Sequence, residues 1–367
     1  MKQDQSCLQR HGGFHHAAPL LFLLLLAAGH MTIAKVREIR PRLSIRPVII
    51  RNVSYRADGG VFAVPNFVSA GSVALFQVNE QSAIAAVPPR LSEKDFMRSS
   101  GLFFLRKQSD GDPFMAFVPL AENLSGYAVD FATTGGLLAI AGGNQVLLYD
   151  SDAEWEMVKS LTIGQSVTRA VFSPDGKRLA ILADGKLYLF STETYAAVAT
   201  VEPVPESRFC DVTFSSDNSR CAVFEYRTVM FDGAARIRIF SARNGAHDRD
   251  LPQLPARTSS EPLQNLPLLS YAPGDTLLAV TVPAGFAGKV FLVQSNDGTM
   301  VREFKGYCHA FSPDGTMFVA DGKVLSTRDW SILGKLPRST RTCVFSPTEP
   351  VIVTVTQESI RRFRMEE

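Results

Sequence analysis

The most constraining feature of this chain is a five-residue motif that recurs along most of its length. It reads Phe-Ser-Pro-Asp-Gly at residues 172–176 and again at residues 311–315. Weaker copies keep part of the motif, and along the whole chain its aromatic position is filled by Tyr55, Phe96, Phe131, Phe172, Phe214, Tyr271, Phe311 and Phe345. The period of about 40 residues is typical of stacked arrays, in which each repeat is one supersecondary unit that packs on the next.

Each repeat has the same internal pattern, which is clearest between Arg169 and Val201. Four short apolar runs are separated by turn signals, namely Pro-Asp-Gly at 174–176, Asp-Gly at 184–185 and Ser-Thr-Glu-Thr at 191–194. Tight hairpins need the positive φ that glycine adopts easily, and no segment has the length or period of an amphipathic helix. The repeat therefore predicts a four-stranded antiparallel meander. Its third strand recurs at residues 73–76, 146–149, 237–240 and 290–293.

Stacked meanders of this size predict an all-β fold, the β-propeller, because one meander cannot bury both of its faces alone. The repeat count predicts eight four-stranded blades, or seven if the repeat at Phe96 is an insertion. The last repeat stops near Met365, after its third strand. Residues 32–40 contain an alternating stretch that can supply the missing strand, so we expect the N-terminal strand to pair with the C-terminal blade and remove an open sheet edge.

The Phe-Ser-Pro-Asp-Gly motif, followed by an apolar strand, resembles the WD40-like and related bacterial repeat propellers over residues 32–367. No repeat ends in Trp-Asp and no Gly-His pair opens a blade, so the Asp, His, Ser and Trp network of eukaryotic WD40 repeats is absent. The resemblance implies a platform for protein interactions, which is a step by analogy because propellers host many functions.

Composition excludes several other classes. Hydrophobic residues make up 46% of the 367 residues and charged residues 20%, which is typical of a folded globular chain rather than a disordered one. A net charge of +2 argues against a chain-wide surface for nucleic acid. Five cysteines are too few for a disulfide framework. Cys210 and Cys221 flank a predicted turn at 216–217, so they are either two buried free thiols or, in an exported protein, a bridge.

The first thirty residues have a pattern of their own. Residues 19–28 are as apolar as the core of a secretory signal peptide, and Ala27-x-Gly29 supplies small residues of the cleavage type. The run is too short to cross a bilayer comfortably, and only Lys2 and Arg10 precede it, whereas several basic residues follow it. We expect residues 1–30 to be a signal-peptide-like leader, or a non-native extension, and 31–367 to be a single propeller domain. An exported, periplasmic or secreted protein is favoured; a true start at Met31 would make it cytoplasmic.

The sequence shows no catalytic constellation. Only His247 and His309 lie inside the repeats, and there is no Gly-x-Ser-x-Gly elbow, phosphate-binding glycine motif, CxxC or HExxH. His309 is expected to be a hydrogen-bonded structural residue, with a position facing the channel as the alternative. No catalytic, cofactor-binding or metal-binding residue is predicted. Aspartates that precede glycine are expected to serve turns; among them are Asp58, Asp175, Asp184, Asp232, Asp314 and Asp321.

Three long connections are predicted to emerge on one face, at 225–235, 252–267 and 281–288. Aromatic, Met and Arg side chains are enriched in interface cores. The candidate partner-binding residues are Tyr226, Arg227, Met230, Phe231, Arg257 and Phe286. The alternative is that these loops fold over the channel and pack on one another.

Joining the termini would also gather basic residues on one blade, namely Lys35, Arg37, Arg361 and Arg362. Such a patch could make weak contact with an anionic surface, although a merely solvated outer strand is the alternative. The sequence thus predicts a non-enzymatic, monomeric interaction scaffold that binds a protein or peptide and no nucleic acid. The alternative is a propeller oxidoreductase or lyase that holds a cofactor or sugar in its channel.

Overall fold

In the computed structural model every element of the described residues is a β-strand. The described residues are 35–44, 52–65, 73–78, 84–85, 101–107, 113–119, 128–153, 155–164, 166–227, 234–254, 268–282, 288–306, 308–356 and 359–366. All of them belong to the unit Ala34–Glu367. The predicted all-β class is confirmed for this part of the chain.

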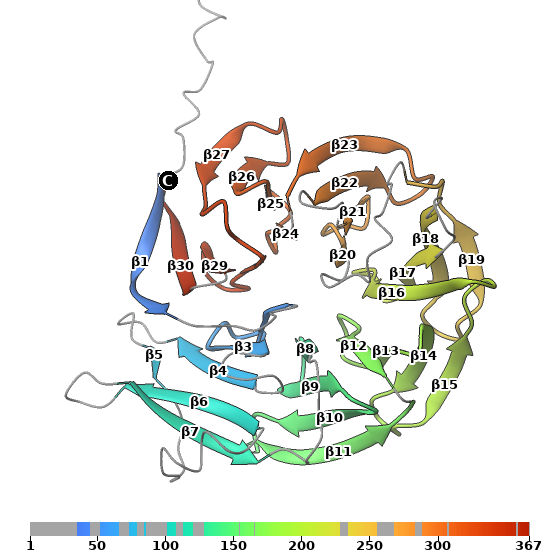
Figure 1. Ribbon diagram of the computed structural model, residues 1–367, viewed down its shortest axis with the longest axis horizontal. Helices are drawn as coiled ribbons and strands as arrows, with labels where there is room; N and C mark the ends of the chain where they lie inside the picture. Colours follow the sequence, from blue (N-terminus) through green and yellow to red (C-terminus); the bar gives the residue numbers. More distant parts are fainter. Residues whose placement is uncertain are drawn as a thin grey trace, which may run out of the picture. The chain divides into compact units, whose positions relative to one another are not determined.

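The described strands form seven sheets, and five of these are four-stranded antiparallel meanders in chain order (Figure 1). The first two are β8 (Ala128–Phe131), β9 (Leu137–Gly142), β10 (Gln145–Asp150) and β11 (Glu156–Thr162), then β12 (Val167–Phe172), β13 (Arg178–Ala183), β14 (Lys186–Ser191) and β15 (Ala197–Val201). The third is β16 (Ser207–Phe214), β17 (Arg220–Arg227), β18 (Ala234–Ser241) and β19 (His247–Asp250). The last two are β20 (Leu268–Tyr271), β21 (Leu277–Val282), β22 (Lys289–Gln294) and β23 (Met300–Lys305), then β24 (His309–Phe311), β25 (Met317–Ala320), β26 (Lys323–Ser326) and β27 (Ile332–Lys335). The predicted four-stranded antiparallel meander is thus confirmed for these five sheets.

The sixth sheet joins strands from the two ends of the described chain. It contains β28 (Thr342–Phe345), β29 (Val351–Val355), β30 (Ser359–Glu366) and β1 (Lys35–Ser44). β1 runs antiparallel to β30, with Lys35 opposite Glu366 and Ser44 opposite Ser359, and Figure 1 shows the two strands side by side. The outer strand that the last repeat lacks is therefore supplied in this sheet by β1.

The seventh sheet carries an additional hairpin. Its strands are β2 (Ser54–Tyr55), β3 (Val61–Pro65), β4 (Val73–Val78), β6 (Gly101–Lys107) and β7 (Pro113–Pro119), and β5 (Ile84–Ala85) pairs with β4. β6 lies parallel to β4, and β7 pairs with β6 (Figure 1). The aromatic slot at Phe96 lies outside the described residues, and the hairpin that follows it extends this sheet without forming a sheet of its own.

The residues of the recurrent motif form the turn between the first and second strands of the sheets that carry it. In the turn after β12, Ser173 Oγ donates to Asp175 Oδ1 at 2.6 Å and accepts from the amide of Arg178 at 2.9 Å. Asp175 Oδ1 also accepts from the amide of Lys177 at 3.0 Å, and Gly176 has a φ of +69°. The serine and the aspartate thus satisfy backbone groups that the tight turn leaves unpaired, and glycine adopts the left-handed conformation at little cost. Equivalent bonds form at Ser312 and Asp314.

Both faces of these sheets are buried, because alternate side chains of one strand pack on different neighbours. In β13, Leu179 and Ile181 join a cluster with the β8–β11 sheet, whereas Ala180 and Leu182 join a cluster with the β16–β19 sheet. Similar clusters join each sheet to the next, from the β2–β4 sheet to the β28–β30 sheet. Burial on two faces explains why the strands are continuous apolar runs instead of alternating ones.

Side-chain hydrogen bonds reinforce the contact between successive first strands. Ser54 Oγ in β2 accepts from the amide of Phe131 in β8 at 2.9 Å. Asp130 Oδ2 in β8 accepts in turn from the amide of Phe172 in β12 at 2.8 Å. Each of these amides thus has its acceptor on a side chain of the preceding sheet, which satisfies a buried donor. The sequence motif identifies the aromatic slot but not these connections.

Candidate functional site

The three long connections predicted to form a binding face start from one common edge of two neighbouring sheets. β17 ends at Arg227 and β18 begins at Ala234, and these two residues are paired. Ala235 forms an isolated bridge with Leu254, which follows β19 in the chain. In the next sheet, Val282 at the end of β21 lies opposite Lys289 at the start of β22. The chain therefore leaves and re-enters both sheets along the same side, as expected from the meander topology.

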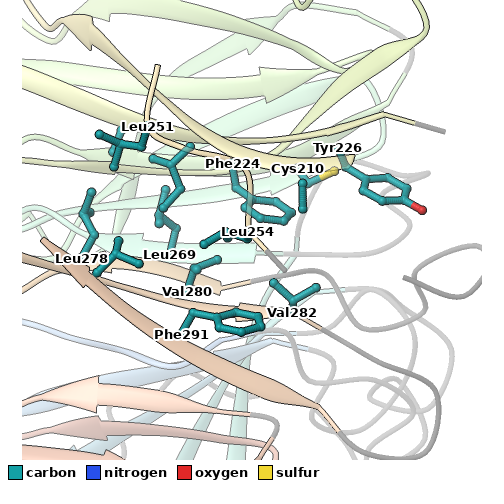
Figure 2. Close-up of a cluster of buried hydrophobic side chains, with 14 of the residues drawn as sticks. Cys210, Phe224, Tyr226, Leu251, Leu254, Leu269, Leu278, Val280, Val282 and Phe291 are labelled. Atoms are coloured by element: carbon teal, nitrogen blue, oxygen red, sulfur yellow. The ribbon is translucent and has the colours of Figure 1, made fainter. Parts of the chain in front are cut away.

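The core beneath this edge is well packed. Residues from both sheets interdigitate in one apolar cluster, and Figure 2 shows side chains of the β16–β19 sheet facing those of the β20–β23 sheet. Phe224 and Phe291, among its largest members, are almost completely buried. Such an interior has the density of an organic crystal and positions the bases of the connections rigidly.

Tyr226 corrects the predicted binding surface. We expected it to lie in a long connection, but β17 continues to Arg227 and β18 already begins at Ala234, so the connection is shorter than predicted. Tyr226 occupies the strand position two residues after Phe224 and therefore faces the same cluster, where it is only 5% exposed (Figure 2). Its ring is part of the core and is not available to a partner.

Arg227 is the candidate residue that the structure places at the surface. Its side chain is half exposed, and its Nη2 lies 2.9 Å from Glu206 Oε2, a carboxylate that is itself exposed. An exposed pair of this kind contributes little to stability, so both side chains can exchange partners. Met230, Phe231, Arg257 and Phe286 lie outside the described residues, as do most residues of the three connections.

A buried carboxylate, which the sequence analysis did not single out, lies two residues before Arg227 on β17. Glu225 is 1% exposed, its Oε1 accepts from the amide of Val204 at 2.8 Å, and its Oε2 lies 2.6 Å from Arg236 Nε. Asp250 lies opposite Arg238 on β19, and its Oδ1 is 3.0 Å from Arg238 Nε. The signal for this network is the spacing of Arg236 and Arg238, which places both on one face of β18, but their partners follow only from the register.

Asp211 forms a charged connection between three sheets. Its carboxylate is buried in β16, lies 3.0 Å from Arg169 Nε in β12 and accepts from the amide of Leu269 in β20 at 2.6 Å. Burial raises the pKa of Asp211, and the charge of Arg169 opposes that shift. In β8, burial likewise raises the pKa of Asp130 to about 6, again against the charge of Arg169. These acids are held by backbone amides and by one arginine, as expected of structural groups.

His309 is a structural histidine, as the first of the two sequence alternatives predicted. It is 6% exposed at the start of β24, with Nδ1 at 2.7 Å from Thr281 Oγ1 and Nε2 at 2.9 Å from Ser270 Oγ. Burial lowers its pKa to about 3, so the ring stays neutral in the folded protein. Within the described part of the chain, no group of three or more His, Cys, Asp and Glu side chains is arranged to hold a metal ion.

The basic residues predicted to gather near the termini are brought together only in part. Arg37 on β1 is exposed and lies 3.7 Å from Glu366, and the half-buried Arg361 donates from Nε to Ser359 Oγ at 3.0 Å. Arg362, by contrast, is 7% exposed and is not part of a surface patch. Its neighbour Phe363, which points to the opposite face of β30, is also 7% exposed, so both faces of the strand are covered at this position. The strand position of Lys35 is described, but its side chain is not.

The cysteines also differ from one predicted alternative. All four described cysteines are free and buried, so Cys210 and Cys221 are the two free thiols of the other alternative. Cys221 lies opposite Phe214, not opposite Cys210, which occupies a register shift between Phe209 and Asp211. The two thiols belong to clusters on opposite faces of their sheet.

No helix among the described residues is long and apolar enough to span a bilayer.

Comparison with known proteins supports the fold. No family model and no curated protein matches the sequence. Among solved structures, the chain is similar to the β-propeller domain of Cps50 (Swd1) from Myceliophteria thermophila, with a TM-score of 0.60 and 13% sequence identity over 89% of this chain and 100% of that domain. The chain thus has the fold of a β-propeller. The resemblance to the WD40-like propellers, predicted from the repeated motif, is confirmed at the level of the fold.

Proposed function

We propose that this chain is a seven-bladed WD40-like propeller that serves as a non-enzymatic scaffold, binding a protein or peptide at the common edge of its β16–β19 and β20–β23 sheets. Two features support it. Three connections leave that edge together. Beneath them lies a rigid base of packed apolar side chains, flanked by the ion pairs of Arg236 with the buried Glu225 and of Arg238 with the exposed Asp250. Loops on a rigid scaffold are the usual place for binding residues.

The ring is closed in this proposal by the sheet that contains β1. In support, Thr348 Oγ1, between β28 and β29, donates to the carbonyl of Asp58 in the β2–β3 turn at 3.5 Å. The last sheet therefore contacts the first described one, while apolar clusters join every sheet between them in chain order. Seven sheets in cyclic contact, with the β6–β7 hairpin as an insertion, favour seven blades over eight.

The observation that carries the interaction role is the exposed charge of Arg227, two residues after a buried acid on β17. Arg227 shares the edge with the chain segments that contain Phe231 and Phe286, so one partner can contact all three connections. Arginine and aromatic residues dominate the binding energy of many interfaces. The exposed Glu206–Arg227 pair gives the same edge both signs of charge, which favours a partner with complementary polar groups over a nucleic acid.

The test compares two triple variants for capture of the native partner. The edge variant carries Arg227→Ser, Phe231→Ser and Phe286→Ser. The matched control carries three exposed changes away from this edge, Met157→Ser on β11, Arg243→Ser in the turn between β18 and β19, and Ile332→Ser on β27. Both should keep the circular dichroism spectrum of the wild type. We expect the edge variant to lose a stoichiometric partner that the wild type and the control retain; equal capture by all three proteins would refute the site.

A further inference from the structure

Cys308 and Cys343 form the closest pair of thiols in the described part of the chain. Cys308 precedes β24 directly, and Cys343 is the second residue of β28. Their Sγ atoms lie 3.7 Å apart, and both residues are buried in one apolar cluster with Val319, Phe345 and Ile352. Cys308 Sγ also lies 3.9 Å from the carbonyl oxygen of Thr340. No sequence spacing pointed to this pair.

The two residues belong to different sheets. β24 is the first strand of the β24–β27 sheet, and β28 is the first strand of the sheet that contains β29, β30 and β1. These sheets are joined by side-chain packing, and no ladder of backbone hydrogen bonds links β24 to β28. A disulfide between Cys308 and Cys343 would therefore add a covalent link between two sheets that are joined here by side-chain packing.

The geometry is within reach of a disulfide. Bonded sulfur atoms lie about 2.05 Å apart, so the present separation must shorten by about 1.7 Å, which small rotations of two side chains can supply. The other described thiols offer no such approach, because Cys210 and Cys221 face different clusters of the β16–β19 sheet. The proximity of Cys308 and Cys343 is therefore specific to this pair.

We propose that Cys308 and Cys343 form a reversible disulfide between neighbouring blades, through exchange with a low-molecular-weight disulfide. In the first step, the thiolate of one cysteine attacks the oxidant and releases one small thiol, leaving a mixed disulfide. The second cysteine then displaces the other small thiol. Two S–H bonds are lost and one S–S bond forms, and the two electrons and two protons leave in the two molecules of small thiol. A small thiol in excess reverses both steps.

The surroundings predict slow exchange. The hydrogen bond to Cys308 and burial raise the pKa of Cys343 well above its usual value, which keeps the thiolate scarce near neutral pH. Because the thiolate is the reactive species, we expect the rate of cross-linking to rise about tenfold per pH unit below that pKa. Once formed, the bond encloses the whole β24–β27 sheet in a covalent loop and ties it to the sheet shared by β1 and β30.

The experiment uses the folded full-length chain treated with oxidised glutathione. Free thiols are then blocked with an alkylating reagent under denaturing conditions, and the protein is digested and analysed by mass spectrometry. We expect a linked peptide pair containing Cys308 and Cys343, together with a fall of about 2 Da in the intact mass, both reversed by a phosphine reductant. The matched control, Cys210→Ser with Cys221→Ser, should give the same linked pair.

Two results would overturn the proposal. One is a wild-type chain that keeps Cys308 and Cys343 as free thiols or as mixed disulfides with glutathione while it remains folded. The other is a linkage of either residue to a different cysteine at equal yield. Neither result depends on whether a cysteine variant folds, because both are read from the wild type. A Cys343→Ser variant, where folded, should show no linked peptide pair.

Discussion

Acidification should destabilise this protein through one buried imidazole. His309 has both ring nitrogens within hydrogen-bond distance of hydroxyls, and burial lowers its pKa from 6.5 to about 3. A group whose folded pKa is depressed contributes stability that is fully present above its unfolded pKa. That contribution is lost as the pH falls toward the folded value. The relevant window therefore runs from about pH 6.5 down to about pH 3.

The size of this pH effect on the free energy of unfolding is set by the pKa of the imidazole in the unfolded chain. At pH 5 the unfolded imidazole is protonated and the folded one is not, so the proton stabilises only the unfolded state. Between pH 8 and pH 5 the free energy of unfolding should therefore fall by about 2 kcal/mol. This is because pH 5 lies about 1.5 units below the unfolded pKa, and each unit corresponds to about 1.36 kcal/mol. The result is insensitive to the folded pKa as long as that value stays below about 4.

Asp130 acts in the opposite direction. Its pKa is raised to about 6 from 3.8, so its contribution is fully present below pH 3.8 and is lost as the pH rises through about 6. Acidification from pH 8 to pH 5 therefore stabilises the protein by about 1.4 kcal/mol through this group and masks part of the effect of His309. For this reason the wild type alone is not a sufficient test.

The assay is a pair of urea titrations, at pH 8 and pH 5, on the wild type and on His309→Gln, followed by tryptophan fluorescence. The glutamine amide can hydrogen-bond Thr281 or Ser270 but does not titrate in this range. The wild type should lose about 2 kcal/mol more than the variant between the two pH values, a midpoint difference on the order of 0.7 M for a slope near 3 kcal/mol per M. Equal losses in the two proteins would show that His309 is not buried as a neutral ring.

Three further predictions concern stability. Arg169→Met should lower the free energy of unfolding by about 3–5 kcal/mol at pH 7, because it leaves the carboxylate of Asp211 buried without its cation. Adding Asp211→Asn should restore part of this loss. If urea titrations show no restoration, Arg169 does not act by neutralising Asp211. Asp130→Asn should remove the stabilisation of about 1.4 kcal/mol between pH 8 and pH 5, and an unchanged pH dependence would exclude its raised pKa. Gly185→Ala should lower the melting temperature more than Gly274→Ala. Both glycines have positive φ, but only at the first does the added carbon come within 2.9 Å of a neighbouring sheet, at Arg208 Cβ, whereas at the second no described atom lies within 4 Å. Equal shifts by calorimetry would contradict this steric explanation.

The local structure of this protein follows from its sequence. The Ser-Pro-Asp-Gly turns after β12 and β24 use side chains and a glycine that lie within a few residues of one another, so short-range chemistry is enough to predict them. The apolar runs that follow predict strands, and their repetition predicts stacked meanders. The strands β13 and β14 accordingly fall where the pattern of residues 169–201 places them.

The residues that connect separate repeats could not be predicted in the same way. Tyr226 was expected at the surface because the length of β17 depends on its pairing with β18, a property of two segments together. Arg362 was assigned to a basic patch because its charge is evident in the sequence, whereas its burial depends on what packs against β30.

The sequence alone determined the structure of the single repeat, since turns and strand periodicity depend on neighbours along the chain. What only the tertiary structure decided is which distant groups meet, such as Arg169 with Asp211, His309 with Thr281, and Cys308 with Cys343. The physical reason is that these contacts depend on how one sheet is set against the next. That arrangement arises from the packing of whole faces and leaves no mark at a fixed spacing in the sequence.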